Sequence, residues 1–180
     1  MNPKNNFIAL PIPTRDGQFV ARYSEKGLAG LNFPKFGRAE LPLGQAARQR
    51  SPTKQNGVPA KIRAWHHTTE TALKSILAGR KPRNLPPLDL AGTEFQKSVW
   101  SALRKIPIGK TKSYGEIAQA IGRPKAVRAV GGACGANPVP VLVPCHRVLA
   151  TNKKLGGFSG GLDWKRSLLK REGITLPSTG

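Results

Sequence analysis

The N-terminal third of the chain carries a strand pattern. Residues 18–24 alternate apolar and polar side chains, and residues 28–33 resume the pattern after a turn at residues 25–27. An alternation with a period of two, broken by a glycine turn, is typical of an antiparallel hairpin. A short apolar stretch at residues 7–13 precedes it. We therefore expect a small antiparallel sheet near the N-terminus.

A helix is predicted at residues 64–78. Thr68 or Thr69 is a candidate N-cap, and Gly79 is expected to end the helix. The apolar positions that recur at helical spacing are Ala72, Leu73, Ile76 and Leu77. His66 and His67 lie in the same stretch as weak candidate ligands. Because no cysteine lies near them, we expect no zinc site there.

Helical signals become stronger from Thr93, which is expected to cap a helix that ends at residues 106–109. Ser113, followed three residues later by Glu116, predicts a capping box for a helix over residues 114–121. A turn at residues 122–125 leads into another helix over residues 126–136. This is the spacing of a helix-turn-helix, a motif that also occurs in proteins that bind no DNA.

The helix over residues 126–136 is built from small side chains, and Arg128 is its one long side chain. Small side chains cannot reach base edges deep in the major groove, but they allow close approach to a sugar-phosphate surface. The pattern predicts a minor-groove or backbone binder that inserts one side chain into the base stack.

Charge and composition narrow the choice of partner and compartment. The 180 residues carry a formal net charge of +21, spread over both halves. This charge favours a polyanion, either nucleic acid or polyanions without specificity. The sequence shows no membrane-length apolar run, no signal-peptide pattern and too few cysteines for a disulfide framework. We expect a cytoplasmic protein, associated with the nucleoid if the cell is prokaryotic, that does not bind membranes.

Two segments without periodicity divide the chain. Residues 34–59 are rich in Gly, Pro, Gln and Arg, which predicts a flexible basic loop, either solvated or in contact with phosphates. Residues 80–92 are proline-rich and predict a link between domains. We expect a structural domain over residues 1–90 and a second domain, with the functional site, over residues 91–180.

The strongest chemical signal surrounds Cys145. Residues 140–144 are apolar or proline, which predicts a short buried strand. Cys145 follows directly, with His146 and Arg147 after it. A cysteine among basic groups is expected to have a lowered pKa and to act as a nucleophile. A buried free cysteine can also serve as a small structural hydrophobe.

Glu172 ends a predicted helix over residues 162–172. A helix C-terminus disfavours a carboxylate, so Glu172 is expected to have a charged or polar partner, of which a buried imidazole is the natural one. A plain solvent-facing position is the alternative.

Two strings resemble one family. NPVPVLVPCHRV at residues 137–148 resembles the active-site motif of the O6-alkylguanine-DNA alkyltransferases, or methylated-DNA–protein-cysteine methyltransferases. GTEFQKSVWSALRKIPIGKTKSYGEIAQAIGRPKAVRAVGGA at residues 92–133 resembles their DNA-binding segment. The resemblance is strong over residues 93–175 and loose over residues 7–90. It implies a monomeric α+β protein with an RNase H-like N-terminal sheet plus helix, and a mainly helical C-terminal domain with a winged-helix type of helix-turn-helix.

The resemblance implies direct-reversal DNA repair. The alkyl group of O6-methylguanine, and of O4-methylthymine, in double-stranded DNA would move irreversibly to Cys145 after the nucleotide is flipped out. His146 would take the thiol proton through a water, Glu172 would orient His146, and Asn137 would brace the turn. No cofactor and no metal are expected. The protein would be used once, because a thioether is very stable.

The resemblance also assigns contact residues. The tyrosine matching Tyr114 helps to push the nucleotide out, and the arginine matching Arg128 fills the hole that it leaves. The implied substrate-binding residues are Tyr114, Val148, Phe158, Ser159 and Gly160. The implied DNA-binding residues are Tyr114, Gly115, Arg123, Val127, Arg128 and Thr151.

Three other functions compete with this interpretation. A binder of alkylated DNA that transfers nothing is disfavoured, because Cys145 is present. A winged-helix transcription regulator is disfavoured by the scarcity of base-reading side chains. A Cys-His hydrolase needs an oxyanion hole, which the sequence leaves open. All three are separated by asking whether Cys145 gains an alkyl group from DNA.

Overall fold

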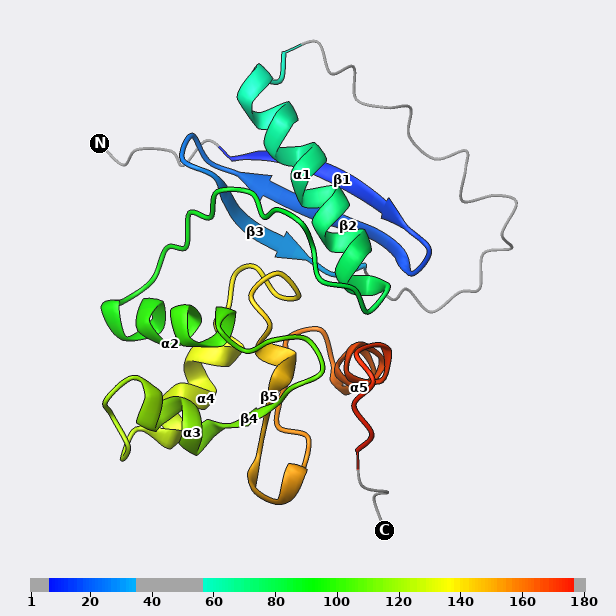
Figure 1. The fold of residues 1–180 in the computed structure, drawn as a ribbon. Coiled ribbons are helices and arrows are strands. Elements are labelled where there is room, and N and C mark those ends of the chain that lie inside the picture. The colour runs from blue at the N-terminus through cyan, green and yellow to red at the C-terminus, as the bar shows by residue number, and fades with distance from the viewer. Residues whose placement is uncertain (1–6, 35–56, 177–180) are drawn as a thin grey trace.

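The computed structural model describes residues 7–34 and 57–176, and it shows a mixed α+β fold with a small antiparallel sheet and several helices (Figure 1). Most of the predicted basic loop, residues 35–56, lies outside the described residues. In chain order, the strands and helices are β1 (Ile8–Thr14), β2 (Gly17–Tyr23), β3 (Leu28–Asn32), α1 (Ala60–Leu77), α2 (Glu94–Arg104), β4 (Lys112–Ser113), α3 (Tyr114–Ala120), α4 (Val127–Gly135), β5 (Val148–Leu149) and α5 (Leu162–Arg171).

The predicted N-terminal sheet is confirmed. Strands β1, β2 and β3 pair antiparallel in that order, and the apolar stretch at residues 7–13 supplies most of β1. Phe19, Ala21 and Tyr23 of the central strand are fully buried, as the alternating pattern requires. Helix α1 lies across one face of this sheet (Figure 1). The sheet and α1 therefore share a core.

The predicted start and cap of α1 were wrong. The helix begins at Ala60, after Pro59, so Thr68 and Thr69 lie inside it. Their hydroxyls donate to the carbonyls of Ala64 and Trp65 one turn earlier, at 3.0 and 2.8 Å. The helix starts earlier because buried Ile62 extends the apolar face by two turns ahead of Thr69.

The segment over residues 80–92 covers the edge of the sheet. The amide of Leu28 donates to Pro87 O at 2.8 Å, and the amide of Asp89 donates to Leu28 O at 2.9 Å. Ser24 Oγ donates to Asp89 Oδ2 at 2.6 Å. These bonds satisfy backbone groups of β3 that an edge strand would otherwise expose. The predicted domain boundary near residue 90 stays a prediction.

The capping predictions in the second half are confirmed. Thr93 forms a capping box with Gln96 at the start of α2, and Ser113 forms one with Glu116 at the start of α3. A short turn joins α3 to α4, and both helices contact each other and α2. Trp100 of α2 is buried and donates its indole N–H to Ala133 O of α4 at 2.8 Å. This bond fixes α4 relative to α2.

The strand predicted at residues 140–144 was wrong, although the segment is buried as expected. The chain makes a tight turn here, in which the amide of Val143 donates to Val139 O at 2.9 Å and Val141 has φ 74°. Pro140 and Pro144, at the two ends of the predicted strand, lack the N–H groups that a strand ladder needs. Pro144 follows the turn, and Cys145 then begins a short 3-10 helix, Cys145–Arg147, that is buried.

The sheet and the second half of the chain pack directly together. The Trp164 ring of α5 lies 5.5 Å from Phe19 and 5.1 Å from Phe33, measured between ring centroids. The amide of Leu31 in β3 donates to Pro138 O at 2.8 Å, just before the tight turn. The sheet thus supports the two segments that flank the cysteine, α5 and residues 137–144.

Replacing Thr93 by Ala should lower the free energy of unfolding by about 1 kcal/mol, because α2 loses a side-chain acceptor for its first turn. The matched variant is Thr68→Ala. Its hydroxyl bonds within the exposed side of α1, and we expect almost no loss, since Ala favours a helix interior. Urea unfolding of both variants checks this; an equal loss in the two would contradict the cap assignment.

Candidate active site: a buried thiol beside a histidine–glutamate–arginine cluster

The thiol of Cys145 is buried and is held by one side chain. Asn137 Nδ2 lies 3.0 Å from Cys145 Sγ and donates also to Val143 O at 2.8 Å. Asn137 Oδ1 accepts from the amide of Val139 at 3.1 Å. The Asn137 side chain therefore bonds the backbone at both ends of the tight turn, Val139 and Val143, and also the thiol of Cys145. These bonds fix the position of the sulfur.

The expected lowering of the Cys145 pKa was wrong. Burial raises the pKa of the thiol, and the Asn137 hydrogen bond and the charge of Lys165 offset this only in part. The basic neighbours in sequence do not help as predicted, because both His146 and Arg147 are directed at Glu172. The resting thiol is therefore protonated at neutral pH.

Glu172 accepts three hydrogen bonds from buried groups. His146 Nε2 lies 2.9 Å from Glu172 Oε1. Arg147 donates from Nε to Oε2 and from Nη2 to Oε1, both at 2.8 Å. Burial raises the pKa of Glu172, but the bonds from His146 and Arg147 outweigh burial and lower it to about 2. The carboxylate is thus ionised at neutral pH, and of the two alternatives the buried-imidazole partner is the one observed.

This arrangement sets the tautomer of His146. Burial lowers the pKa of the imidazole, more than Glu172 raises it. The neutral ring must donate Nε2–H to the carboxylate, which leaves Nδ1 as an acceptor. Nδ1 is buried and has no hydrogen-bond partner among the described residues. His146 therefore presents one free basic nitrogen inside the protein.

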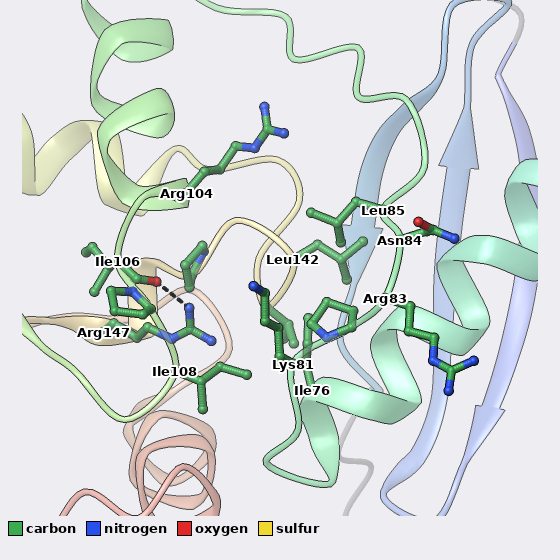
Figure 2. Close-up of a pocket in the computed structure, with 14 residues that line it drawn as sticks. Ile76, Lys81, Arg83, Asn84, Leu85, Arg104, Ile106, Ile108, Leu142 and Arg147 are labelled. Carbon is green, nitrogen blue, oxygen red and sulfur yellow. Dashed lines mark hydrogen bonds between the residues drawn. The ribbon is translucent and has the colours of Figure 1, made fainter.

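Sequence reasoning missed the structural role of Arg147. Besides its two bonds to Glu172, Arg147 donates from Nη1 to Ile106 O at 2.7 Å. Arg147 and Leu142 line a cavity of about 440 Å³, and Cys145 is not among its lining residues. Figure 2 shows the side chains around this cavity. An arginine inside an apolar, buried stretch needs a carboxylate partner. That requirement could have indicated from the sequence that Arg147 pairs with a buried acid.

Lys165 was also missed, although it is fully buried. Its ammonium group donates to Val148 O at 2.7 Å and to Gly156 O at 3.3 Å. Burial lowers the pKa of Lys165, while the charge of a Cys145 thiolate would raise it. Lys165 precedes the buried Leu168, Leu169 and Glu172 by three, four and seven positions, a helical spacing that could have revealed its burial.

Three of the predicted substrate-binding residues, Tyr114, Phe158 and Gly160, take part in close packing around aromatic rings. Tyr114 is half-buried and packs on Gly156, where any Cβ would collide with the phenol ring. The ring of Phe158 lies 6.4 Å from His146 and 5.5 Å from Phe33, between centroids. A Cβ at Gly160 would collide with Phe33. The two glycines thus allow close packing of aromatic rings.

The remaining predicted contact residues fall into two groups. Val148 is buried and reaches the cluster through its carbonyl, whereas Ser159 is exposed. The predicted DNA-binding positions other than Tyr114 are partly or fully exposed on α3, α4, the turn between them and residue 151: Gly115, Arg123, Val127, Arg128 and Thr151. No ion pair involves Arg123 or Arg128 within residues 7–34 and 57–176.

The described residues contain no group of three or more His, Cys, Asp or Glu side chains placed to hold a metal ion. His66, a weak candidate ligand, has its Nδ1 3.1 Å from the hydroxyl of buried Tyr23. Among the described helices, none is long and apolar enough to cross a membrane.

The ionised Glu172 carboxylate should make the free energy of unfolding depend on pH in the acidic range. The folded pKa of about 2 lies below the ordinary value of 4.5, so its stabilising contribution is present above about pH 4.5 and is lost as the pH falls toward 2. Urea unfolding between pH 5 and 2 should show a loss on the order of 3 kcal/mol in the wild type that Glu172→Gln lacks. Glu94→Gln, which removes an exposed carboxylate, controls for the charge; equal pH slopes in all three proteins would contradict the prediction.

The charge of Lys165 should stabilise the thiolate. Lys165→Met is therefore expected to move the pH profile of Cys145 alkylation by iodoacetamide to higher pH, because Lys165 lowers the Cys145 pKa. Cys134→Ala in both proteins removes the second thiol from the readout. An unchanged pH profile would show that Lys165 only fills space.

Part of the chain is similar in sequence to known proteins. Residues 94–174 match the family model described as 6-O-methylguanine DNA methyltransferase, DNA binding domain. The chain is 62% identical over 82 residues to a methylated-DNA–protein-cysteine methyltransferase of Methanosarcina acetivorans, and 50% identical over 106 residues to one of Mycobacterium bovis. These matches cover 46% and 59% of this chain and 53% and 64% of the relatives. The chain thus spans between half and two thirds of the length of these curated relatives.

Solved structures match over most of the chain. The crystal structure of O6-methylguanine methyltransferase from Mycobacterium tuberculosis is 34% identical, with a TM-score of 0.66 and 97% of both chains covered. The structure of the Mycobacterium tuberculosis OGT in complex with DNA is 37% identical, with a TM-score of 0.63 and 90% of both chains covered. With this identity over nearly the whole length of a solved relative, the chain belongs to the O6-methylguanine-DNA methyltransferase family.

Proposed function

We propose that this protein repairs alkylated DNA by moving the methyl group of O6-methylguanine in a duplex onto Cys145. The observation that carries the proposal is the buried, Asn137-held thiol beside a histidine whose free nitrogen is basic and whose other nitrogen is fixed by Glu172. Family membership supplies the substrate class. O4-methylthymine is proposed as a second substrate of the same chemistry.

DNA binding would begin with charge. The +21 net charge attracts the duplex, and exposed Arg123 and Arg128 flank the small-residue face of α4. We infer that α3 and α4 act as a helix-turn-helix of winged-helix type that approaches the minor groove. Arg128 would enter the stack while Tyr114 displaces the damaged nucleotide, because a buried thiol cannot reach a base inside a duplex.

The reaction would start with a proton transfer. The thiol of Cys145 gives its proton, through a water, to Nδ1 of His146, and Glu172 stabilises the resulting imidazolium. Lys165 and Asn137 stabilise the thiolate. The chemical logic is that of a nucleophile, a base and an orienting carboxylate.

The methyl transfer itself is an in-line displacement. The sulfur of Cys145 attacks the methyl carbon, a C–S bond forms, and the bond between carbon and guanine O6 breaks. The departing base carries the electron pair and takes up a proton from water, with Tyr114 as hydrogen-bond donor to the base, and the imidazolium of His146 returns its proton to water. No cofactor is needed, since the methyl group moves directly from base to sulfur. The thioether does not revert, so each molecule acts once.

The wider predictions belong to the same proposal. We propose a monomeric cytoplasmic protein with a structural domain over residues 1–90, whose sheet and α1 are of RNase H-like type, and a DNA-binding and acceptor domain over residues 91–180. Phe158, Ser159 and Gly160 would form the pocket wall, with Phe158 set against His146. Gly115, Val127 and Thr151 would contact the DNA backbone.

The direct test is a mass measurement after mixing the protein with a duplex that carries one O6-methylguanine. We expect one added methyl group per protein, on the peptide that contains Cys145. Cys134→Ala is the matched control and should accept the methyl group normally, because burial raises the pKa of Cys134 to about 12; Cys145→Ala should accept none. Binding of the duplex without any change in mass would instead indicate a damage-binding protein.

A further inference from the structure

An ion pair joins the turn between β1 and β2 to the last residue of α5. Asp16 Oδ1 and Oδ2 accept from Arg171 Nη2 and Nη1 at 2.6 and 2.7 Å. Residues 16 and 171 are thus held by two parallel bonds, a geometry that fixes both direction and distance. The Asp16 carboxylate is itself held in place, since its turn is closed by Thr14, whose hydroxyl accepts from the Asp16 amide at 3.1 Å and donates to Gly17 O at 2.7 Å.

The C-terminal end of α1 also contacts Arg171. Arg171 Nη1 donates to Leu77 O at 3.0 Å, in the last turn of α1, where carbonyls lack helical partners. Gly79 has φ 69°, and any Cβ there would collide with the carbonyl oxygen of Arg171. The β1–β2 turn and the end of α1 therefore both contact Arg171. Asp16 and Leu77 bond its side chain, and Gly79 packs against its backbone.

Arg171 directly precedes Glu172, the carboxylate that orients His146. Helix α5 ends at Arg171, and the ends of helices fray unless something holds them. Glu172 is the C-cap of this helix, so fraying would move its carboxylate relative to the imidazole. Gly109 also packs close to the backbone of Glu172, since an added Cβ at Gly109 would lie 3.4 Å from Glu172 O.

We propose that Asp16 is a positioning residue for methyl transfer, acting through Arg171 to hold Glu172 against His146. This inference rests on the proposed function of the Cys145 site. It gives the N-terminal half, which carries none of the proposed catalytic groups, a part in the reaction. The competing account is that the ion pair adds only stability, which would leave the geometry of the cluster unchanged.

The two accounts differ in a spectroscopic readout. The chain has three histidines, so isotope-labelled histidine gives a simple NMR spectrum in which His146→Gln identifies the signal of the Nε2–H···Glu172 bond. In Asp16→Asn we expect this signal to shift or broaden while His66 and His67 stay unchanged. With saturating duplex, the single-turnover rate of methyl transfer should fall about tenfold, as expected when a reacting group is slightly misplaced.

The matched control is Glu70→Gln. It makes the same change in charge in the N-terminal half and breaks an ion pair of equal length, Lys74 Nζ to Glu70 Oε1 at 2.6 Å, but it does not touch α5. We expect its transfer rate to stay within about twofold of the wild type, since exposed helical pairs contribute little. DNA affinity measured for both variants removes the effect of added positive charge.

A second pair of variants covers the case in which Asp16→Asn folds poorly. Arg171→Lys keeps the charge but loses the paired bonds, and should give an intermediate rate. The reversed pair, Asp16→Arg with Arg171→Asp, should recover part of the rate and of the NMR signal. A folded Asp16→Asn protein with a normal rate and an unchanged His146 signal would overturn the inference. If the wild type itself transfers no methyl group, the proposed function fails, and the NMR comparison still decides whether Asp16 positions Glu172.

Discussion

The buried carboxylate of Glu172 is the constraint on which the site depends. A carboxylate inside a protein is costly unless its oxygens are fully bonded, and here three donors from two consecutive residues supply the bonds. Those residues, His146 and Arg147, directly follow Cys145. Because the three are contiguous, bonding the carboxylate also fixes the backbone that carries the thiol.

The same constraint separates the roles of neighbouring side chains. Arg147 neutralises the charge of Glu172 and also donates to Ile106 O, so its role is structural. His146 bonds Glu172 through Nε2 and leaves Nδ1 without a hydrogen-bond partner among the described residues, so Nδ1 is the nitrogen that could take the thiol proton in the proposed reaction. Lys165 reaches the site from α5 and is the positive charge whose effect on Cys145 is not cancelled by a bonded carboxylate. A basic sequence around a cysteine is therefore a poor guide to its pKa until the partners of each base are known.

Sequence patterns predicted most of the elements, because alternation, capping boxes and glycine stops act locally. The hairpin around Gly27, the caps at Thr93 and Ser113, and the helix over residues 126–136 depend on near neighbours and were found where expected. The start of α1 was missed because Thr68 can bond an internal carbonyl as well as cap a helix. The strand predicted at residues 140–144 was wrong because the proline spacing there produces a turn, which hydrophobicity alone does not reveal.

The site was partly predictable for a related reason. Cys145, His146 and Glu172 could be grouped from a motif and from an unfavourable helix-end charge, both readable along the chain. Arg147 and Lys165 bond to groups 25 and 17 residues away, and such long-range bonds leave only an indirect trace, the burial of a charged residue. The Asp16–Arg171 pair joins residues 155 positions apart, and no local pattern around either residue indicates the other.

In the proposed reaction, the cluster would also allow a thiol with a raised pKa to react. Moving a proton from Cys145 to His146 leaves the net charge of the buried cluster unchanged, since one negative and one positive charge appear together. Ionisation against bulk water would instead place a single new charge in a site of low polarity, at the full desolvation cost. Glu172, 2.9 Å from His146 Nε2, would stabilise the new imidazolium, and the charge of Lys165 would stabilise the new thiolate. Burial therefore suppresses the thiolate at rest and would strengthen the charge pair once it forms, which is consistent with the acceptor role proposed for Cys145.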